Sequence, residues 1–336
     1  MIDRRIAIDP PRCGLLPFMF IASALVIAGM PASVAETFPA SNIIRIIAPT
    51  NPGPPPDVIA RIIANELSDS EGWKVIVENR PGALQTIAMA DVLKKPADGL
   101  SIFPMSLGAI ATPTLFPDKG LQLETDFAPV VKIATGYTVL VVNPSVPATS
   151  ISQLVALLKA EPDKFNYSSG PFGTPGHLLG EMFKLQTGAR ATLVHYPQSQ
   201  QRITDLLNGT SQLAFYNTTS ILELVATGKL RALAVTAPRR IAALKDVPTV
   251  AEQGFPSLQV EDWVGFVVKS GTPNDAIARL NAAVNKALTK QKVRDAFASL
   301  GYEPAGGTAA ELGDLIKSQV TYWGKVVKDS GIKTPQ

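Results

Sequence analysis

Residues 50–57 are the part of the sequence whose types and spacing could best hold a small molecule. The segment reads Thr-Asn-Pro-Gly-Pro-Pro-Pro-Asp and follows an apolar run at residues 43–48 that predicts a strand. An amphipathic pattern that predicts a helix comes next, and the amides and partial positive charge at a helix N-terminus favour small anions. Four of the eight residues are prolines, which have no N–H group, so the loop is fixed in shape but poor in main-chain donors.

The other residues that could do chemistry form no catalytic or metal-binding pattern. The sequence has no Gly-X-Ser-X-Gly segment and no His/Glu metal cluster, and its one cysteine is Cys13. His177 follows Gly-Thr-Pro-Gly near a predicted helix start, where it could either bond an anion or brace the glycine-rich loop. His195 ends a predicted strand, and we interpret it as structural. We therefore predict a binding protein that is not an enzyme and that uses no cofactor and no metal.

Residues 1–35 have the features of a secretory signal peptide. Arg4, Arg5 and Arg12 precede an apolar run at residues 14–28, and small residues follow at positions 33–35. The apolar run is shorter than the ~20 residues that span a bilayer. We predict that this leader is cleaved and that the mature protein, which then has no cysteine, resides in the periplasm. The pair Arg4-Arg5 leaves open whether export uses a general secretory or a twin-arginine signal.

Charge and length limit the possible partners. The chain has 31 basic and 28 acidic residues; three of the former and two of the latter precede residue 36, so the mature chain keeps a net charge of +2. The basic residues are scattered and form no concentrated face, which argues against nucleic acid as a partner. A mature chain of about 300 residues is long enough for two ordinary domains.

Short strand patterns alternate with helical patterns along the mature chain, which is typical of α/β layers with mostly parallel sheets. We predict strands at residues 43–48, 75–77, 101–104, 139–142, 192–195, 213–215, 230–235 and 265–268. The chain is expected to cross between two lobes near residues 143–147 and 256–262. This divides the sequence into the signal peptide at 1–35, a first lobe at 36–142 with 259–336, and a second lobe at 143–258.

Many segments of the mature chain resemble one family of receptors. They occur in the family's order at residues 44–47, 57–61, 77–83, 126–130, 140–144, 166–170, 204–209, 228–236, 246–252, 271–273 and 323–328. Together with the leader, they resemble the solute receptors of tripartite tricarboxylate transporters, also called the Bug family. The similarity covers nearly the whole mature chain, which makes it more specific than any single motif.

The resemblance implies a two-lobed periplasmic binding protein of the Venus-flytrap, type II-like kind, in which each lobe is a mostly parallel sheet flanked by helices. Such a receptor closes on a small solute, here a carboxylate or an aromatic acid, and delivers it to a tripartite tricarboxylate-type membrane permease. We expect a monomer. A periplasmic sensor subunit that presents its solute to a membrane histidine kinase remains the alternative, because both roles use closure around a solute.

Carried over by position, the ligand-binding residues come from loops of both lobes, and none is catalytic. In the first lobe they are Thr50, Asn51, Gly53, Pro54, Asp57, Leu84, Gln85, Thr86 and Ser106. In the second lobe they are Ser169, Gly170, Gly173, Thr174, His177, Tyr196, Tyr216 and Asn217.

The chain departs from the family pattern within these loops. It has Pro54 where a second glycine is usual, Leu84 and Gln85 where Gly-Gly is usual, Tyr216 where aspartate is usual, and Pro197 where lysine is usual. The loss of the aspartate argues against an amino acid as the solute. Either the site prefers a less charged, more apolar or aromatic solute, or these residues lie behind the pocket and a carboxylate site is intact. The residues decide neither the identity of the solute nor its affinity.

Overall fold

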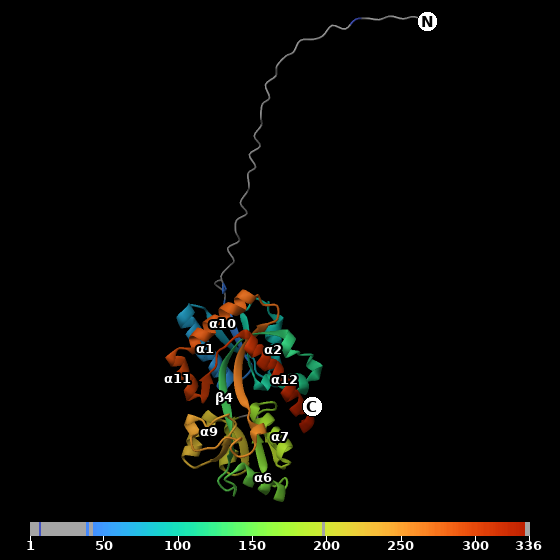
Figure 1. Ribbon diagram of the computed structural model, residues 1–336, viewed down its shortest axis with the longest axis vertical. Coiled ribbons are helices and arrows are strands. Elements are labelled where there is room, and N and C mark those ends of the chain that lie inside the picture. Colours follow the sequence, from blue (N-terminus) through green and yellow to red (C-terminus); the bar gives the residue numbers. More distant parts are fainter. Residues whose placement is uncertain (1–6, 8–37, 40–42, 197–198, 333–336) are drawn as a thin grey trace, which may run out of the picture. The chain divides into compact units, whose positions relative to one another are not determined.

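The computed structural model describes Ala7 and residues 38–39, 43–196 and 199–332 (Figure 1). The predicted signal peptide lies outside these ranges except for Ala7, and the departure at Pro197 lies outside them as well. Within the described ranges no helix has both the length and the apolar character needed to cross a membrane.

The first half-sheet contains the strands nearest the start and the end of the chain. Strand β1 (Ile44–Ala48) pairs in parallel with β2 (Val75–Asn79) on one side and with β3 (Ser101–Ser106) on the other. Strand β9 (Glu261–Lys269) runs antiparallel to β3, and β4 (Phe127–Val142) runs antiparallel to β9. The short strand β10 (Tyr302–Pro304) adds to β4. Parallel pairing thus holds for the three outer strands, while the strands that lead to the other half are antiparallel.

The second half-sheet repeats this arrangement with the middle of the chain. Strands β5 (Asn166–Ser169), β6 (Thr192–His195) and β7 (Leu213–Asn217) are parallel, in the order β6-β5-β7. The C-terminal part of β4 pairs antiparallel with β7 and with β8 (Arg231–Val235).

Strand β4 belongs to both half-sheets. Its partner changes from β9 to β7 between Tyr137 and Thr138, before the predicted lobe boundary at residue 143. The return crossing follows the short turn Pro256–Leu258 and enters β9 at Glu261, inside the segment predicted for it. Two strands therefore connect the halves, and the division into lobes at residues 142 and 258 stays a prediction.

Helices cover both faces of each half-sheet (Figure 1). In the first half, α1 (Pro55–Glu71), α10 (Asn274–Leu288) and α11 (Gln291–Ser299) share one apolar core with β1, β3, β4 and β9. The opposite face is covered by α2 (Thr86–Lys94), α12 (Ala309–Ser330) and the short helices α3 (Leu107–Ile110), α4 (Thr112–Leu115) and α5 (Leu123–Asp126).

In the second half, α6 (Ile151–Ala160) and α7 (Pro175–Thr187) pack on one face, in a core that is continuous with that under α12. Helices α8 (Ser199–Leu207) and α9 (Thr218–Ala226) pack on the other face. Helices α7, α8 and α9 follow β5, β6 and β7 in that order, just as α1, α2 and α3 follow β1, β2 and β3. In each half the carboxyl ends of the parallel strands and the helix N-termini that follow them therefore lie at one edge, which is where α/β sheets bind ligands.

Candidate functional site

The loop at residues 50–57 is held by the buried carboxylate of Asp57. Oδ2 of Asp57 accepts from the Gly53 amide at 3.0 Å, and Oδ1 accepts from Arg61 Nε at 3.0 Å and from Asn79 Nδ2 at 2.8 Å. Asn79 Nδ2 also donates to the Thr50 carbonyl at 2.8 Å. Burial raises the pKa of Asp57, but the hydrogen bonds from Arg61, Asn79 and Gly53 outweigh it and hold the pKa below its usual value. Asp57 therefore shapes the loop from within.

The N-terminus of α1 has few amides left for an anion. The amides of Asp57 and Val58 both donate to the Pro54 carbonyl, at 3.0 and 3.2 Å, and Gly53 donates to Asp57. The four prolines of the loop have no N–H. Asn51, Gly53 and Pro54 are exposed, and the Thr50 hydroxyl is buried with no hydrogen-bond partner among the described residues. The amides of Gly53, Asp57 and Val58 are therefore engaged within the loop and the first turn of α1.

The second loop of the first half has an unusual backbone at Leu84 and Gln85. Both residues have a left-handed backbone conformation, with φ of 51° and 71°. This conformation costs ordinary residues about 1 to 3 kcal/mol. These are the two positions where the resemblance described above implies glycines. The Leu84 carbonyl accepts from Thr112 Oγ1 at 3.0 Å, and Gln85 Nε2 donates to Ser106 Oγ at 3.3 Å. Leu84 and Gln85 thus hold a backbone conformation that favours glycine, and Thr86 follows as the buried first residue of α2.

Leu84 joins the first half to the second. A methyl group added at Gly173 would collide with Leu84 Cδ2, and one added at Gly108 would lie 3.5 Å from the Gly173 carbonyl oxygen. Gly173 is buried and lies in the loop between β5 and α7. The predicted loops around residues 84, 106 and 173 are therefore brought together at the edge where the parallel strands of each half end.

The loop at residues 170–176 is braced by its own side chains. His177 Nδ1 accepts from the Gly173 amide at 3.1 Å, and Thr174 Oγ1 donates to the Pro171 carbonyl at 2.7 Å. Ser169 Oγ donates to the Gly170 carbonyl at 2.8 Å. The His177 ring is buried beside Phe172 and His195, with ring centres 4.6 and 4.9 Å away.

The ionisation of His177 fits this bracing role. Burial, with the neighbouring charges of His195 and Lys184, lowers the pKa of His177 to about 3. The imidazole is therefore neutral at neutral pH and can accept the Gly173 amide proton at Nδ1. The sequence left open whether His177 binds an anion or braces the glycine-rich loop. In the structure its Nδ1 atom braces the loop by accepting from the Gly173 amide.

Arg202 is a prominent residue of the site that the sequence did not single out. It extends from the first turn of α8, is only 8% exposed, and donates from Nη2 to the carbonyls of Ser168 and Phe215 at 3.2 and 2.6 Å. Its guanidinium lies 3.7 Å from the ring centre of Tyr216. Burial lowers the pKa of Arg202, yet an arginine side chain stays charged in proteins. No motif of the sequence marks Arg202, and its unfavourable place in the first turn of α8 follows from the structure.

Three predicted residues of the second half are engaged within the protein. Tyr196 Oη donates to Asp205 Oδ2 at 2.8 Å, and Asn217 Nδ2 donates to Asp262 Oδ2 at 2.9 Å. The Tyr216 ring stacks on Arg202, while its hydroxyl is buried with no hydrogen-bond partner among the described residues. The side chains of Tyr196, Asn217 and Tyr216 therefore bond or pack within the protein.

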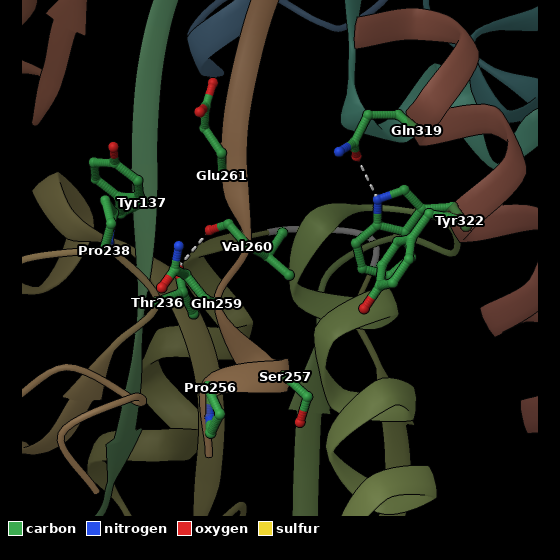
Figure 2. A pocket seen from close by; sticks show the side chains of 11 residues that line it. Tyr137, Thr236, Pro238, Pro256, Ser257, Gln259, Val260, Glu261, Gln319 and Tyr322 are labelled. Atoms are coloured by element: carbon green, nitrogen blue, oxygen red, sulfur yellow. Dashed lines mark hydrogen bonds between the residues drawn. The ribbon is translucent and has the colours of Figure 1, made fainter. Parts of the chain in front are cut away.

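A separate cavity of about 430 Å³ lies where the chain crosses between the halves (Figure 2). Two hydrogen bonds order its wall, from Trp323 Nε1 to Gln319 Oε1 at 2.8 Å and from Thr236 Oγ1 to the Val260 carbonyl at 2.8 Å. None of the predicted binding residues lines it. Its lining consists of Tyr137, Thr236, Pro238, Pro256, Ser257, Gln259, Val260, Glu261, Gln319, Tyr322 and Trp323.

Comparison with known proteins decides the family. Residues 59–332 match the family described as "Tripartite tricarboxylate transporter family receptor", or TctC. The chain belongs to this family. The prediction from the resemblance is confirmed, and so is the prediction of a binding protein, because the family consists of solute receptors and not of enzymes.

Individual relatives match this TctC receptor over most of their length. Protein BugT of Bordetella pertussis is 35% identical over 321 residues, which are 94% of this chain and 96% of that protein. The structure of R. palustris Rpa4515 with adipate is 32% identical with a TM-score of 0.77, covering 86% of this chain and 97% of that one. MatC from Rhodopseudomonas palustris with bound malate is 26% identical with a TM-score of 0.76, covering 85% and 98%.

The likeness to the structure of the periplasmic binding protein BugD, 27% identical with a TM-score of 0.77 over 87% of this chain and 99% of that one, confirms the predicted mixed α/β fold class. The described residues of this receptor contain no cluster of histidine, cysteine, aspartate or glutamate that could hold a metal ion.

Proposed function

We propose that this chain is a periplasmic receptor that binds a small organic acid, or a related aromatic or apolar solute, and delivers it to a tripartite tricarboxylate-type permease. One observation carries the proposal: Leu84 of the first half meets Gly173 of the second at the edge where both sets of parallel strands end. A solute bound there contacts both halves at once. The adipate and malate held by two relatives support a carboxylate as the solute class.

Closure of two lobes is the mechanism that we propose. Residues 36–142 and 259–336 form one lobe and residues 143–258 the other, and strands β4 and β9 connect them. A ligand can shift an equilibrium between open and closed forms only by its difference in affinity for the two. A solute that touches Gln85 or Ser106 on one side and the loop at residues 170–176 on the other has such a difference, because opening separates these groups. The permease then recognises the closed surface.

Export by a cleaved leader completes this proposal. The leader features at residues 1–35 support it, and the mass of the protein purified from a periplasmic extract tests it. A mass that still includes residues 1–35 would contradict cleavage.

Thermal unfolding of the mature protein tests the binding proposal. We expect malate, adipate or benzoate to raise the melting temperature, since a ligand at ~100 times its dissociation constant adds ~2.7 kcal/mol to the free energy of unfolding. Stabilisation by short dicarboxylates and none by benzoate would reject the aromatic preference. No stabilisation by any of the three acids would reject a carboxylate receptor.

A matched pair of leucine variants locates the site. Leu84→Ala should change the response to the acid that binds, because Leu84 lies between the halves. Leu185→Ala removes the same atoms from an exposed leucine of α7, 44% exposed, and should leave the response unchanged. Equal responses in the two variants would place the solute elsewhere.

A further inference from the structure

The guanidinium of Arg202 lacks a counter-charge in the described structure. No carboxylate of the described residues forms an ion pair with it, and its Nε is buried with no hydrogen-bond partner. The ionisable groups that face it are the phenols of Tyr216, Tyr167 and Tyr196. A charge taken out of water without an opposite charge is costly, so its retention calls for a compensating role.

The surroundings of Arg202 add positive potential. It is the fourth residue of α8, in the first turn of that helix, and the first turn of α7 lies beside it: a Cβ at Gly176 would be 3.4 Å from Nη2. Both helix N-termini carry partial positive charge. A cation at this point is therefore doubly unfavourable unless an anion also binds.

The guanidinium lies directly beneath the glycine-rich loop. A Cβ at Gly170 would be 3.7 Å from Nη1, so the charge lies against the start of the loop. The same loop meets the first half at Gly173, where a Cβ would collide with Leu84 Cδ2. An anion bound between the halves at this loop would therefore lie on the segment that Arg202 contacts.

A purely structural role explains Arg202 less well. Arg231, in the same half, also donates to two backbone carbonyls, those of Val146 and Ala148 at 2.9 and 3.1 Å. Arg231 is only partly buried, so water can share its charge. Bracing two carbonyls therefore does not require full burial of the cation.

We propose that Arg202 supplies the positive charge that selects a carboxylate over an uncharged solute at the loop of residues 170–176. This deepens and rests on the proposed function, and it makes Arg202 a specificity-determining residue that acts through the loop. A cation at this loop favours an acid over a neutral apolar solute.

Binding of charged and uncharged forms of one solute tests this proposal. The probes are malate, adipate and benzoate, each beside its amide, measured by calorimetry on the mature protein. Arg202→Gln should weaken the affinity for the acid about 30-fold and leave the affinity for its amide unchanged. A charge acting over several ångströms at an intermediate dielectric changes an affinity by about this factor. Arg202→Lys should retain most of the affinity, and Arg231→Gln, the matched control, should change neither.

The outcomes separate the two proposals. If the native protein binds an acid and R202Q binds it equally well, or if R202K and R202Q lose it alike, the role of Arg202 is overturned while the receptor function stands. If no acid binds the native protein, both fail. If R202Q does not fold, the test uses the native protein and R202K. Both should bind the acid more tightly than its amide. Equal affinity of the native protein for acid and amide would overturn the proposal.

Discussion

Leu84 packs against Gly173 across the junction of the two halves, so closely that any side chain at position 173 would collide with the leucine Cδ2 atom. Gly173 also has φ of +73°, which favours glycine. The two residues come from loops that follow β2 and β5, and they hold the site loops together.

Gly173→Ala should lower the free energy of unfolding by more than the cost of backbone strain alone. Strain at a left-handed position costs an ordinary residue about 1 to 3 kcal/mol, and the collision with Leu84 adds to it. Gly228→Ala is the matched control, because Gly228 has φ of +71° with nothing within 4 Å. Urea unfolding should show a larger loss for G173A than for G228A. Adding Leu84→Gly should recover part of the difference, and no recovery would show that the contact is unimportant.

Asp262→Asn should change how stability depends on pH. Asp262 is buried, and this raises its pKa to about 6 from 3.8 despite hydrogen bonds from Tyr302 and Asn217. Between these values the folded state holds a proton that the unfolded chain has released, so this group makes stability fall as pH rises. The free energy of unfolding of D262N, plotted against pH, should therefore have a slope more positive than that of the native protein by ~1.4 kcal/mol per pH unit from about pH 4 to pH 6.

Tyr302→Phe is the companion measurement. Tyr302 Oη donates to Asp262 Oδ2 at 2.6 Å, and this bond lowers the pKa of the carboxyl. Removing this hydrogen bond should raise the pKa of Asp262 further, so the pH range in which Asp262 makes stability fall should extend to higher pH. Parallel pH curves for native protein and D262N would contradict the assignment.

His177→Asn should have the opposite effect on the pH slope. The pKa of His177 is lowered by burial from 6.5 to about 3, so between these values the unfolded chain binds a proton that the folded state does not. This group makes stability rise with pH across the window. Asparagine can still accept from the Gly173 amide but does not titrate, so H177N should lose that rise. Chemical denaturation from pH 4 to pH 8 measures it, and an unchanged slope would show that the imidazole titrates normally.

Asp57→Asn should loosen the loop at residues 50–57. The carboxylate accepts from Gly53, Arg61 and Asn79, and an amide would set N–H groups against these donors. We expect a loss of about 1 to 3 kcal/mol in the free energy of unfolding. Asp69→Asn is the control, since the exposed pair of Asp69 with Lys292 should contribute less than about 1 kcal/mol. Equal effects of D57N and D69N would contradict a bracing role for Asp57.

The local pattern of apolar residues predicted those strands that contain a clear apolar run. The strand predicted at residues 192–195 is β6, and the run at residues 43–48 contains β1. The N-terminal part of β4 was missed because Lys132, Thr135 and Gly136 interrupt its apolar pattern. Its extended form depends on pairing with β9, which is more than a hundred residues later in the chain.

Residue type alone could not show which polar groups of the site are free to bind a solute. Asp57 is engaged by Asn79, and Asn217 by Asp262 and Tyr302, all of them distant in sequence. Arg202 became visible only when its burial and its lack of a carboxylate partner among the described residues were known.

The sequence by itself determined the family and the α/β layers, because strand and helix periodicity and ordered local segments depend on neighbours along the chain. The loops of the candidate site stay a prediction. Only the tertiary structure decided that Leu84 meets Gly173, that Asp57 and His177 brace their own loops, and that Arg202 is buried without a carboxylate partner among the described residues. Hydrogen-bond partners, burial and electrostatic environment depend on which distant segments are brought together, and that is set by the packing of the two half-sheets.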